Sequence, residues 1–303
     1  MRLGTRNSPL AMAQAVETRK RLCAAHGWRE DEVELVPVTA SGDKVLDRPL
    51  AEIGGKALWT KELDAWLGEG RIDASVHSAK DVETIRPSEF AFAACLARAD
   101  RRDSLVGAAS IADIPQGATV GTSAPRRAAQ LLWLRPDCKV VTFRGNVATR
   151  LAKLEAGEAD VTFLAAAGLE RLGQSEVGAP LDPEEWTPAA AQGVIVIECR
   201  ADNQAARHAL AAIDHGPTRA ELEAERALLA ELGGTCHSPV AAKCVFDDGR
   251  MVLEAALFSA DGAERVTGDA YFGAGEHAAV RDLARDLLAR SSPAITQLFQ
   301  SDA

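Results

Sequence analysis

One cysteine of this chain lies in a segment that is typical of a loop. Cys236 follows Gly233 and Gly234, and it precedes His237. A catalytic thiol needs a base within hydrogen-bonding distance, and an adjacent histidine normally points elsewhere; a redox role lacks a second cysteine at C-x-x-C spacing. Two interpretations stay open: an unreactive loop thiol, or a thiol that attacks an electrophilic carbon once and then holds the adduct permanently.

A carboxylate beside a cation is a second candidate for chemistry. Asp81 follows Lys80 where the segment 73–82 passes from an expected strand into a loop. The carboxyl ends of strands face the ligand crevice in doubly wound folds, so Asp81 is well placed to act as a buried acid or base. A surface lysine–aspartate pair is the commoner explanation of the dipeptide alone, and His77 alone is more often a hydrogen-bonded structural residue.

Cations gather in one part of an otherwise acidic chain. The net charge is −10, yet residues 121–153 hold seven cations and one anion. The seven are Arg126, Arg127, Arg135, Lys139, Arg144, Arg150 and Lys153. Planar guanidinium groups bind carboxylates or phosphates through paired hydrogen bonds, so several together can hold a small polyanion. A solvated helix face is the alternative, and a nucleic-acid groove would need more stacking aromatics than Trp133 and Phe143.

The order of expected elements predicts an α/β fold. Strands are expected at 2–5, at 33–39 and from 73 on, with a helix after Ser8 that Gly27 stops and another over 59–67. Beyond a polar linker at 98–104, three strand–turn–helix units follow. This order predicts two doubly wound, mainly parallel lobes with helices on both faces and a ligand cleft between them; the strand at 193–200 would return to the first sheet.

The last third predicts a small α+β domain. Thr218 and Glu221 have the spacing of a capping box for a helix that ends near Leu232. Three strands are expected at 240–246, 251–259 and 264–272, followed by a helix with one apolar face.

The composition is that of an ordinary soluble protein. The chain has 303 residues, of which 47% are apolar and 26% charged. No stretch approaches the roughly 20 apolar residues that a membrane span requires, and the six cysteines form neither a metal-site pattern nor a disulfide framework. We therefore expect a cytoplasmic protein without a metal, a membrane partner or a nucleic-acid partner.

Nine segments, in order and spacing, resemble the signature segments of the porphobilinogen deaminase family, also called hydroxymethylbilane synthases. The two most specific are VHSAKDV at 76–82 and FRGNVATRL at 143–151. The others are TRNSPLA, GGKALWTKEL, VGTSAPRR, LAAAGLERLG, PAAAQG, IECR and AERALLAELGGTCHSPVAA. The resemblance covers nearly the whole chain.

The resemblance implies a monomer of three domains. Domain 1 would comprise residues 1–94 with 194–211, domain 2 residues 98–188, and domain 3 residues 216–303. The first two would be lobes like those of periplasmic binding proteins. The third would carry Cys236, which matches the cysteine that binds a dipyrromethane cofactor through a thioether.

The resemblance also implies the reaction. Four porphobilinogen molecules would be joined head to tail, with loss of ammonia, onto the dipyrromethane, and hydrolysis would then release hydroxymethylbilane. Asp81 matches the catalytic aspartate. The positions that match cofactor contacts are Lys80, Thr122, Ser123, Arg126, Arg127, Arg144, Gly145 and Arg150. Those that match substrate contacts are Arg6, Ser8, Trp59, Arg144, Arg150, Arg171 and Gln192.

Some positions depart from the commonest family pattern. They are Glu83, Ala124, Pro125, Ala191 and Thr235. Trp59 stands where phenylalanine is usual, and either stacking on a pyrrole ring or core packing would explain it. A non-catalytic, two-lobed anion-binding protein is the rival hypothesis; it would need neither Cys236 nor Asp81.

Overall fold

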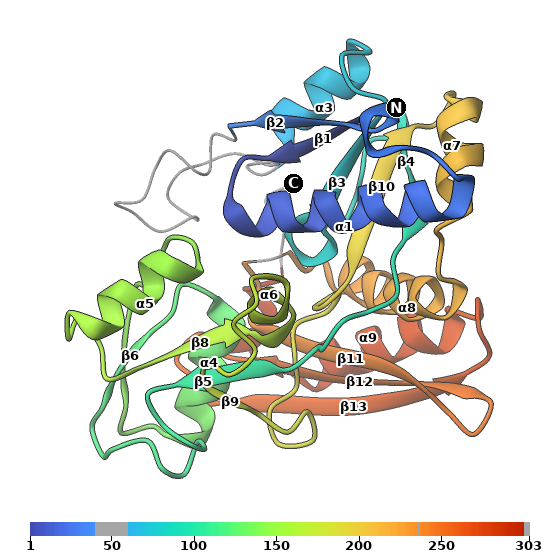
Figure 1. The fold of residues 1–303 in the computed structure, drawn as a ribbon. Helices are drawn as coiled ribbons and strands as arrows, with labels where there is room; N and C mark the ends of the chain where they lie inside the picture. The colour runs from blue at the N-terminus through green and yellow to red at the C-terminus, as the bar shows by residue number, and fades with distance from the viewer. Residues whose placement is uncertain (40–59, 236, 300–303) are drawn as a thin grey trace.

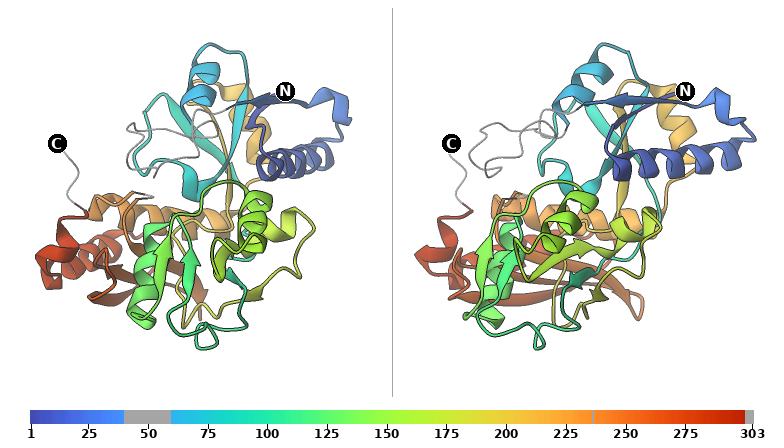
Figure 2. Two further views of the ribbon diagram at one scale, coloured as in Figure 1. Left: turned by 90° about the vertical axis from the view of Figure 1, so that its left-hand side faces the viewer. Right: turned by 60° about the vertical axis from the view of Figure 1, so that its left-hand side comes forward.

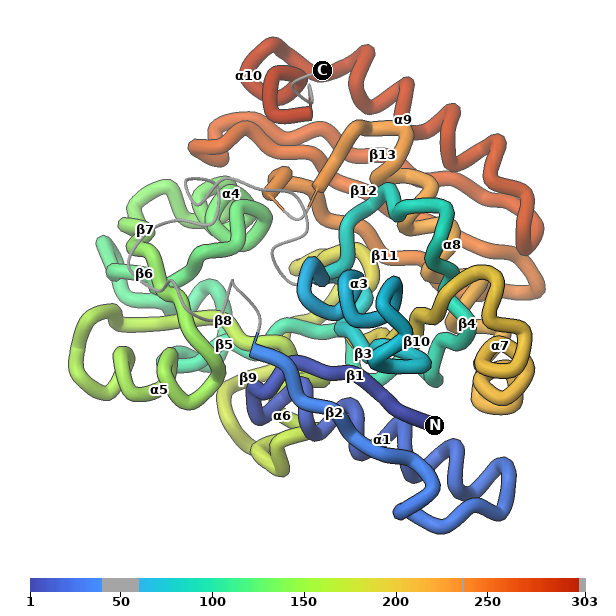
Figure 3. Tube along the Cα trace, turned by 90° about the horizontal axis from the view of Figure 1, so that it is seen from above, coloured from blue at the N-terminus to red at the C-terminus, as the bar shows by residue number. Residues whose placement is uncertain are grey.

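The computed structural model describes residues 1–39, 60–235 and 237–299, which form three sheets with their covering helices (Figure 1). Trp59 and Cys236 lie outside the described residues. In Figure 2 the first lobe lies above, and the second lobe and the third sheet lie beneath it. Seen from above, the three parts occupy different sides of the molecule (Figure 3).

The first lobe combines the start of the chain with a later, returning strand. Its strand order is β2-β1-β3-β10-β4. The strands are β1 (Arg2–Arg6), β2 (Glu34–Val38), β3 (Ala74–Ser78), β4 (Phe90–Cys95) and β10 (Ile195–Arg200). The helices are α1 (Pro9–His26), α3 (Lys61–Gly68) and α7 (Gln204–Ala211). Because β10 pairs with β3 and β4, the predicted return of this strand to the first sheet is confirmed.

Helices cover both faces of this sheet. α1 and α7 share one apolar cluster with Leu3 and Ile197, whereas α3 belongs to another cluster with Val38 and Phe90. The ends of α1 follow the predicted signals: Ser8 Oγ accepts the Ala11 N–H, and Gly27 ends the helix at φ 70°. The residue that follows a helix often has a left-handed backbone conformation, and glycine is the usual residue there.

The second lobe has an equivalent sheet in the order β7-β6-β8-β5-β9. Its strands are β5 (Asp103–Val106), β6 (Thr119–Gly121), β7 (Lys139–Val141), β8 (Val161–Ala165) and β9 (Ala179–Pro180). The helices are α4 (Pro125–Leu134), α5 (Val147–Glu155) and α6 (Ala166–Arg171). They follow β6, β7 and β8 in turn, which confirms the three predicted strand–turn–helix units.

Both sheets are mixed but mainly parallel, as predicted, because four of the five strands described in each sheet run in one direction. β1 is parallel to β2 and β3, but β10 is antiparallel to β3 and β4. In the second lobe β6 is parallel to β7 and β8, but β5 is antiparallel to β8 and β9. The chain passes from the first lobe to the second just before β5 and returns just before β10. Neither strand therefore follows a helical crossover within its own sheet, the connection that keeps consecutive strands parallel.

The last third forms an antiparallel sheet with helices packed on it. The strands are β11 (Val240–Asp247), β12 (Arg250–Phe258) and β13 (Arg265–Phe272), and the helices are α8 (Gly216–Leu232), α9 (Ala278–Arg290) and α10 (Pro293–Thr296). Leu228 of α8 and Leu287 of α9 share one buried cluster with Leu253 of β12. The predicted strands and the apolar face of the last long helix are therefore confirmed.

The predicted capping box at Thr218 is wrong. α8 begins at Gly216, and His215 caps it by accepting the Thr218 N–H on its side chain. Pro217 favours this earlier start because proline suits the first helical positions. The Thr218 hydroxyl instead accepts the backbone N–H of Arg98 at 2.9 Å.

A buried carboxylate on α8 joins the three parts of the molecule. Glu225 is fully buried and accepts the backbone N–H groups of Ala191 at 2.6 Å and Cys244 at 3.0 Å. Its carboxylate also accepts a hydrogen bond from Nη2 of the Arg98 guanidinium at 3.0 Å. One side chain therefore ties α8 to the linker before β5, the segment before β10 and β11.

No helix in the described part of the chain combines the length and the apolar character that crossing a membrane would require.

Replacement of Glu225 by glutamine tests this junction. We expect Glu225→Gln to lower the free energy of unfolding by about 3 kcal/mol, because it leaves the buried Arg98 without this carboxylate. Urea unfolding followed by circular dichroism measures the change. Glu223→Gln is the matched control, since Glu223 lies on the same helix and its side chain is 49% exposed. Equal stability of the two variants would contradict the assigned role of Glu225.

Candidate active site

Asp81 lies on a short turn at the end of β3. Residues Ala79–Asp81 form a single 3-10 turn, whose Ala79 N–H donates to Val194 O at 3.0 Å. Ala79 and Val82 are buried in a cluster that also contains Val196 and Leu222. The turn is thus anchored by its apolar residues, while Lys80 and Asp81 are only partly buried.

Lys80 is held in a positive environment. Its Nζ donates to Gln192 Oε1 at 3.1 Å. The pKa of Lys80 is lowered to about 8, first by burial and then by the positive charge of Arg127, whereas Asp81 and Asp103 oppose the shift. An added anion near Lys80 would relieve this electrostatic strain.

Arg150 of α5 lies in the same field. Its pKa is lowered to about 10, first by burial and then by Arg127 and Arg144, while Asp81 opposes the shift. Its Nε donates to Gly145 O at 3.0 Å. No carboxylate among the described residues forms an ion pair with Arg150. The second lobe thus presents a cation toward Asp81 whose charge the described carboxylates leave largely uncompensated.

Asp103, a carboxylate that no sequence pattern indicated, organises the neighbouring arginines. Asp103, at the start of β5, is fully buried and accepts Arg126 Nη2 at 2.6 Å and Arg127 Nη2 at 2.7 Å. It also accepts Trp186 Nε1 and Gln192 Nε2, both at 2.8 Å. Burial alone would raise the pKa of Asp103, but Arg126 and Arg127 lower it well below its ordinary value.

The two arginines of α4 are therefore engaged within the protein. Arg126 Nη1 donates to Thr187 O at 3.0 Å, and Arg127 Nη1 donates to Phe163 O at 2.9 Å. Both side chains are buried. The Nε of Arg127 is buried and has no hydrogen-bond partner among the described atoms, so this arginine keeps one donor for a ligand.

The turns before α4 and α5 lie side by side. Gly121 of β6 pairs in register with Val141 of β7, so the chain leaves both strands at the same end of the sheet. Thr122 and Ser123 follow β6, and the Thr122 hydroxyl accepts the Ala124 N–H at 3.2 Å. This arrangement brings together the polar residues of the first turn with Arg144 and Gly145 of the second.

Gly145 is required by the shape of the second turn. Its φ is 113°, and a Cβ there would come within 2.6 Å of the Thr149 side chain. Asn146 then caps α5 by accepting the Thr149 N–H at 2.9 Å. The glycine and the cap together turn the chain so that Arg144 is buried before the helix and Arg150 follows within it.

Three further predicted residues have local roles. The Ser8 hydroxyl caps α1, and Arg6 lies at the end of β1. Arg171 of α6 pairs with Glu17 of α1 at 3.1 Å and donates to Gly193 O at 3.2 Å. No hydrogen bond or ion pair of the described residues joins Arg171 directly to Asp81, but Gly193 adjoins Val194, whose oxygen accepts the Ala79 N–H of the Asp81 turn.

The loop that carries Cys236 is described only on either side of that residue. Gly233 ends α8 at φ 69°, and the Thr235 N–H donates to Ser238 Oγ at 3.1 Å. The His237 N–H donates to the Thr235 hydroxyl at 3.1 Å. Burial lowers the pKa of His237.

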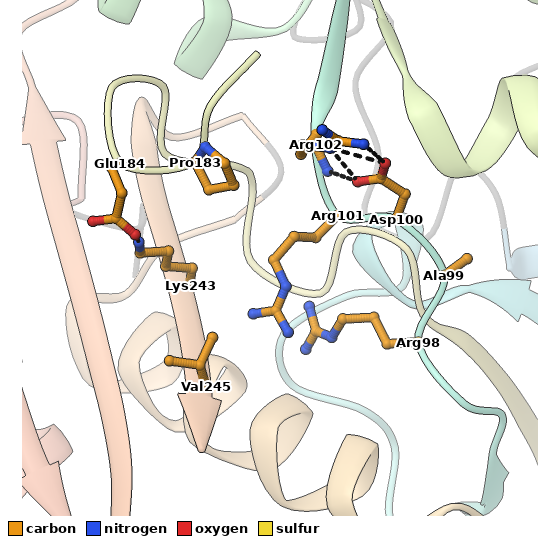
Figure 4. Close-up of a pocket in the computed structure, with 9 residues that line it drawn as sticks. All are labelled: Arg98, Ala99, Asp100, Arg101, Arg102, Pro183, Glu184, Lys243 and Val245. Atoms are coloured by element: carbon orange, nitrogen blue, oxygen red, sulfur yellow. Dashed lines mark hydrogen bonds and ion pairs between the residues drawn. The ribbon is translucent and has the colours of Figure 1, made fainter. Parts of the chain in front are cut away.

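A pocket beside the linker does not include the Asp81 turn among its lining residues. It has a volume of about 460 Å³ and lies between the linker at residues 98–102 and β11 (Figure 4). Its cations are already paired: Arg101 with Glu221, Arg102 with Asp100, and Lys243 with Glu184. This pairing distinguishes the pocket from the surroundings of Asp81.

The surroundings of Asp81 fit a ligand with several carboxylates. Lys80 and Arg150 have lowered pKa values in a positive field, and the buried Nε of Arg127 lacks a partner among the described atoms. A dipyrromethane carries acidic side chains that would complement these groups, and its pyrrole N–H groups would complement the Asp81 carboxylate. In the described part of the chain, no cluster of three or more His, Cys, Asp or Glu residues is arranged to hold a metal ion.

Two family models match the chain. One, described as "Porphobilinogen deaminase, dipyromethane cofactor binding domain", matches residues 1–208. The other, described as "Porphobilinogen deaminase, C-terminal domain", matches residues 220–287.

Two porphobilinogen deaminases match over nearly the full length, and a solved structure matches over a smaller part of the chain. The porphobilinogen deaminase of Sphingopyxis alaskensis is 55% identical over 99% of this chain and 96% of that protein. That of Paracoccus denitrificans is 47% identical over 96% of this chain and 94% of that protein. The BvgS VFT2 domain of Bordetella pertussis, a solved structure, has a TM-score of 0.40 at 18% identity over 70% of this chain and 84% of that chain. The chain therefore belongs to the porphobilinogen deaminase family, as its sequence segments predicted.

Proposed function

We propose that Asp81 is the catalytic acid–base of a hydroxymethylbilane synthase whose primer is attached at Cys236. Family membership confirms the predicted transferase activity in porphyrin biosynthesis and the dipyrromethane cofactor. The observation that carries the assignment of Asp81 is its position on the β3 turn, next to Lys80 and in the electrostatic field of Arg150.

The reaction joins four porphobilinogen molecules head to tail. A dipyrromethane held by Cys236 through a thioether would supply the free pyrrole carbon for the first addition. Each porphobilinogen loses ammonia from its aminomethyl group, the free pyrrole carbon of the chain attacks the resulting electrophilic methylene carbon, and the attacking pyrrole carbon then loses its proton. Hydrolysis by water then releases hydroxymethylbilane.

Asp81 serves two steps of each addition. Its carboxylate accepts hydrogen bonds from pyrrole N–H groups and stabilises the positive charge that develops as ammonia leaves. It then removes the proton from the newly bonded ring carbon. A carboxylate aimed at developing charge acts more strongly in the transition state than in the bound substrate, which is the condition for catalysis.

The cations hold the acidic side chains of the rings. Lys80, Arg144, Arg150 and Arg127 would bind carboxylates of the cofactor and of the growing chain, together with Thr122, Ser123 and Gly145. Arg126 donates from Nη1 to Thr187 O and from Nη2 to Asp103. We therefore propose that it orients the neighbouring side chains of the site as well as binding carboxylates of the ligand. Gln192 Oε1 accepts a hydrogen bond from Lys80 Nζ and so holds the ammonium group in place. We also propose substrate contacts for Arg6, Ser8 and Arg171, and for Trp59, which lies outside the described residues.

We propose three domains: residues 1–94 with 194–211, residues 98–188, and residues 216–303. The three separate sheets support this division. We further propose that the enzyme works as a cytoplasmic monomer, without nucleic acid or a membrane surface as partner, in keeping with its net charge of −10.

Removing the charge of Asp81 tests its catalytic role. We expect Asp81→Asn to fold and keep the dipyrromethane, but kcat should fall by about 10²-fold or more, as for loss of a general acid–base. Intact mass measures the cofactor, and formation of hydroxymethylbilane measures kcat. Asp73→Asn, at the other end of the same strand, is the control. Near-normal turnover by Asp81→Asn would refute the assignment, and an unmodified, inactive wild-type chain would favour the rival anion-binding protein.

The lowered pKa of Lys80 predicts a dependence of stability on pH. Its pKa is about 8 in the folded chain and 10.5 in the unfolded chain. Between these values the unfolded chain binds more protons, so stability rises with pH. In a cofactor-free Cys236→Ser background, we expect the free energy of unfolding to rise from pH 8 to pH 10.5 relative to that of a Lys80→Met variant. A constant difference between the two chains in urea unfolding would contradict the shift.

A further inference from the structure

The loop that follows Asp81 is bound to the segment that leads to Cys236. The Thr84 hydroxyl donates to Gly234 O at 2.8 Å, although the two residues are 150 positions apart in the chain. Thr84 is three residues after Asp81, and Gly234 is two residues before Cys236. A single hydrogen bond therefore connects the backbone around the acid with the backbone around the thiol.

An arginine on α8 reinforces this contact from the side. Arg226 Nη2 donates to the backbone oxygens of Glu83 at 2.7 Å and Thr84 at 2.8 Å. Its guanidinium also lies over the Phe92 ring, 4.8 Å from the centroid. The planar guanidinium thus binds two carbonyls of the loop at once. Movement of the loop relative to α8 would break at least one of these hydrogen bonds, so Arg226 fixes the loop against the helix.

The opposite side of the loop is fixed to the first lobe. The Glu83 carboxylate accepts the Thr60 hydroxyl at 3.0 Å and Arg86 Nη1 at 2.7 Å. Arg86 also pairs with Asp64 of α3 and Glu198 of β10, both at 2.6 Å. The loop is thus held between the first lobe and α8, and it has little freedom to move relative to either.

We propose that Arg226 and Thr84 are positioning residues that fix the distance between the Asp81 carboxylate and the pyrrole chain tethered at Cys236. This inference rests on the proposed function, because it assumes the acid and the tether assigned above. Bond formation requires reacting atoms about 3 to 3.5 Å apart, and an error of about 1 Å is able to lower a rate by about 10²-fold. Neither residue touches the reacting atoms; both act through the backbone of residues 82–84 and 234.

Variants at both positions of the holoenzyme test the proposal. We expect Thr84→Val and Arg226→Gln to retain the dipyrromethane mass, to keep KM within about twofold and to lose about tenfold in kcat, as misplacement of a catalytic group predicts. Thr84→Ser should restore kcat to within about twofold of wild type, because it restores the hydroxyl that donates to Gly234 O. Steady-state formation of hydroxymethylbilane and intact mass supply these values.

Arg219 offers a matched control on the same helix. Its guanidinium pairs with Asp214 at 2.8 Å and donates to Phe92 O at 3.3 Å, so it also joins α8 to the first lobe without contacting residues 82–84. Arg219→Gln should lower the thermal midpoint about as much as Arg226→Gln does, yet leave kcat unchanged. A kcat loss in Arg219→Gln equal to that in Arg226→Gln would show a general effect of stability and would overturn the proposal.

Two other outcomes would also overturn it. If Thr84→Val and Arg226→Gln are folded, carry the cofactor and turn over at the wild-type rate, the contacts do not position the acid. If both variants lack the cofactor mass, the contacts serve its attachment rather than turnover. Failure of the proposed function itself would be distinct, because Asp81→Asn would then turn over at a near-normal rate whatever Thr84→Val and Arg226→Gln do.

Discussion

The buried Asp103 carboxylate is the interaction on which the candidate site depends. It accepts hydrogen bonds from Arg126, Arg127, Trp186 and Gln192, which come from α4 and from the segment that returns to the first lobe. A buried charge must be compensated in this way, and removal of one partner is costly. Because Gln192 gives its Nε2 to Asp103, its Oε1 is left to accept Lys80. Hydrogen bonds through Gln192 therefore connect Asp103 of the second lobe to Lys80, on the turn that carries Asp81.

This pairing also explains how an acidic protein presents a positive site. Asp103 compensates Arg126 and Arg127, whereas the lowered pKa values of Lys80 and Arg150 record positive charge that the described carboxylates compensate only in part. A ligand with several carboxylates removes the repulsion as it binds. The pocket beside residues 98–102 differs because its cations already have carboxylate partners on the protein. Under the proposed function, selectivity for a polycarboxylate would thus follow from which cations the described carboxylates leave uncompensated, rather than from the number of cations.

The parts of the structure that the sequence predicted are those with local signals. Ser8 and Gly27 mark the ends of α1 because capping involves residues a few positions apart. The antiparallel direction of β5 and β10 has no local signal, since it depends on where the crossing chain enters each sheet. Asp103 lacks a signal for the same reason: its nearest arginine partner is 23 positions away. Family resemblance selected the residues of the candidate site, but not the partners that hold them.

Consecutive residues of α8 contact the loop after Asp81 and the segments that join the lobes. Glu225 accepts N–H groups of Ala191 and Cys244, and Arg226 donates to the loop after Asp81. Neighbouring residues on a helix point about 100° apart, so the two side chains reach different parts of the molecule. The same helix ends at Gly233, just before the segment that carries Cys236. Under the proposed function, any displacement of α8 would therefore move the segment before Cys236, the loop after Asp81 and the junction between the lobes together.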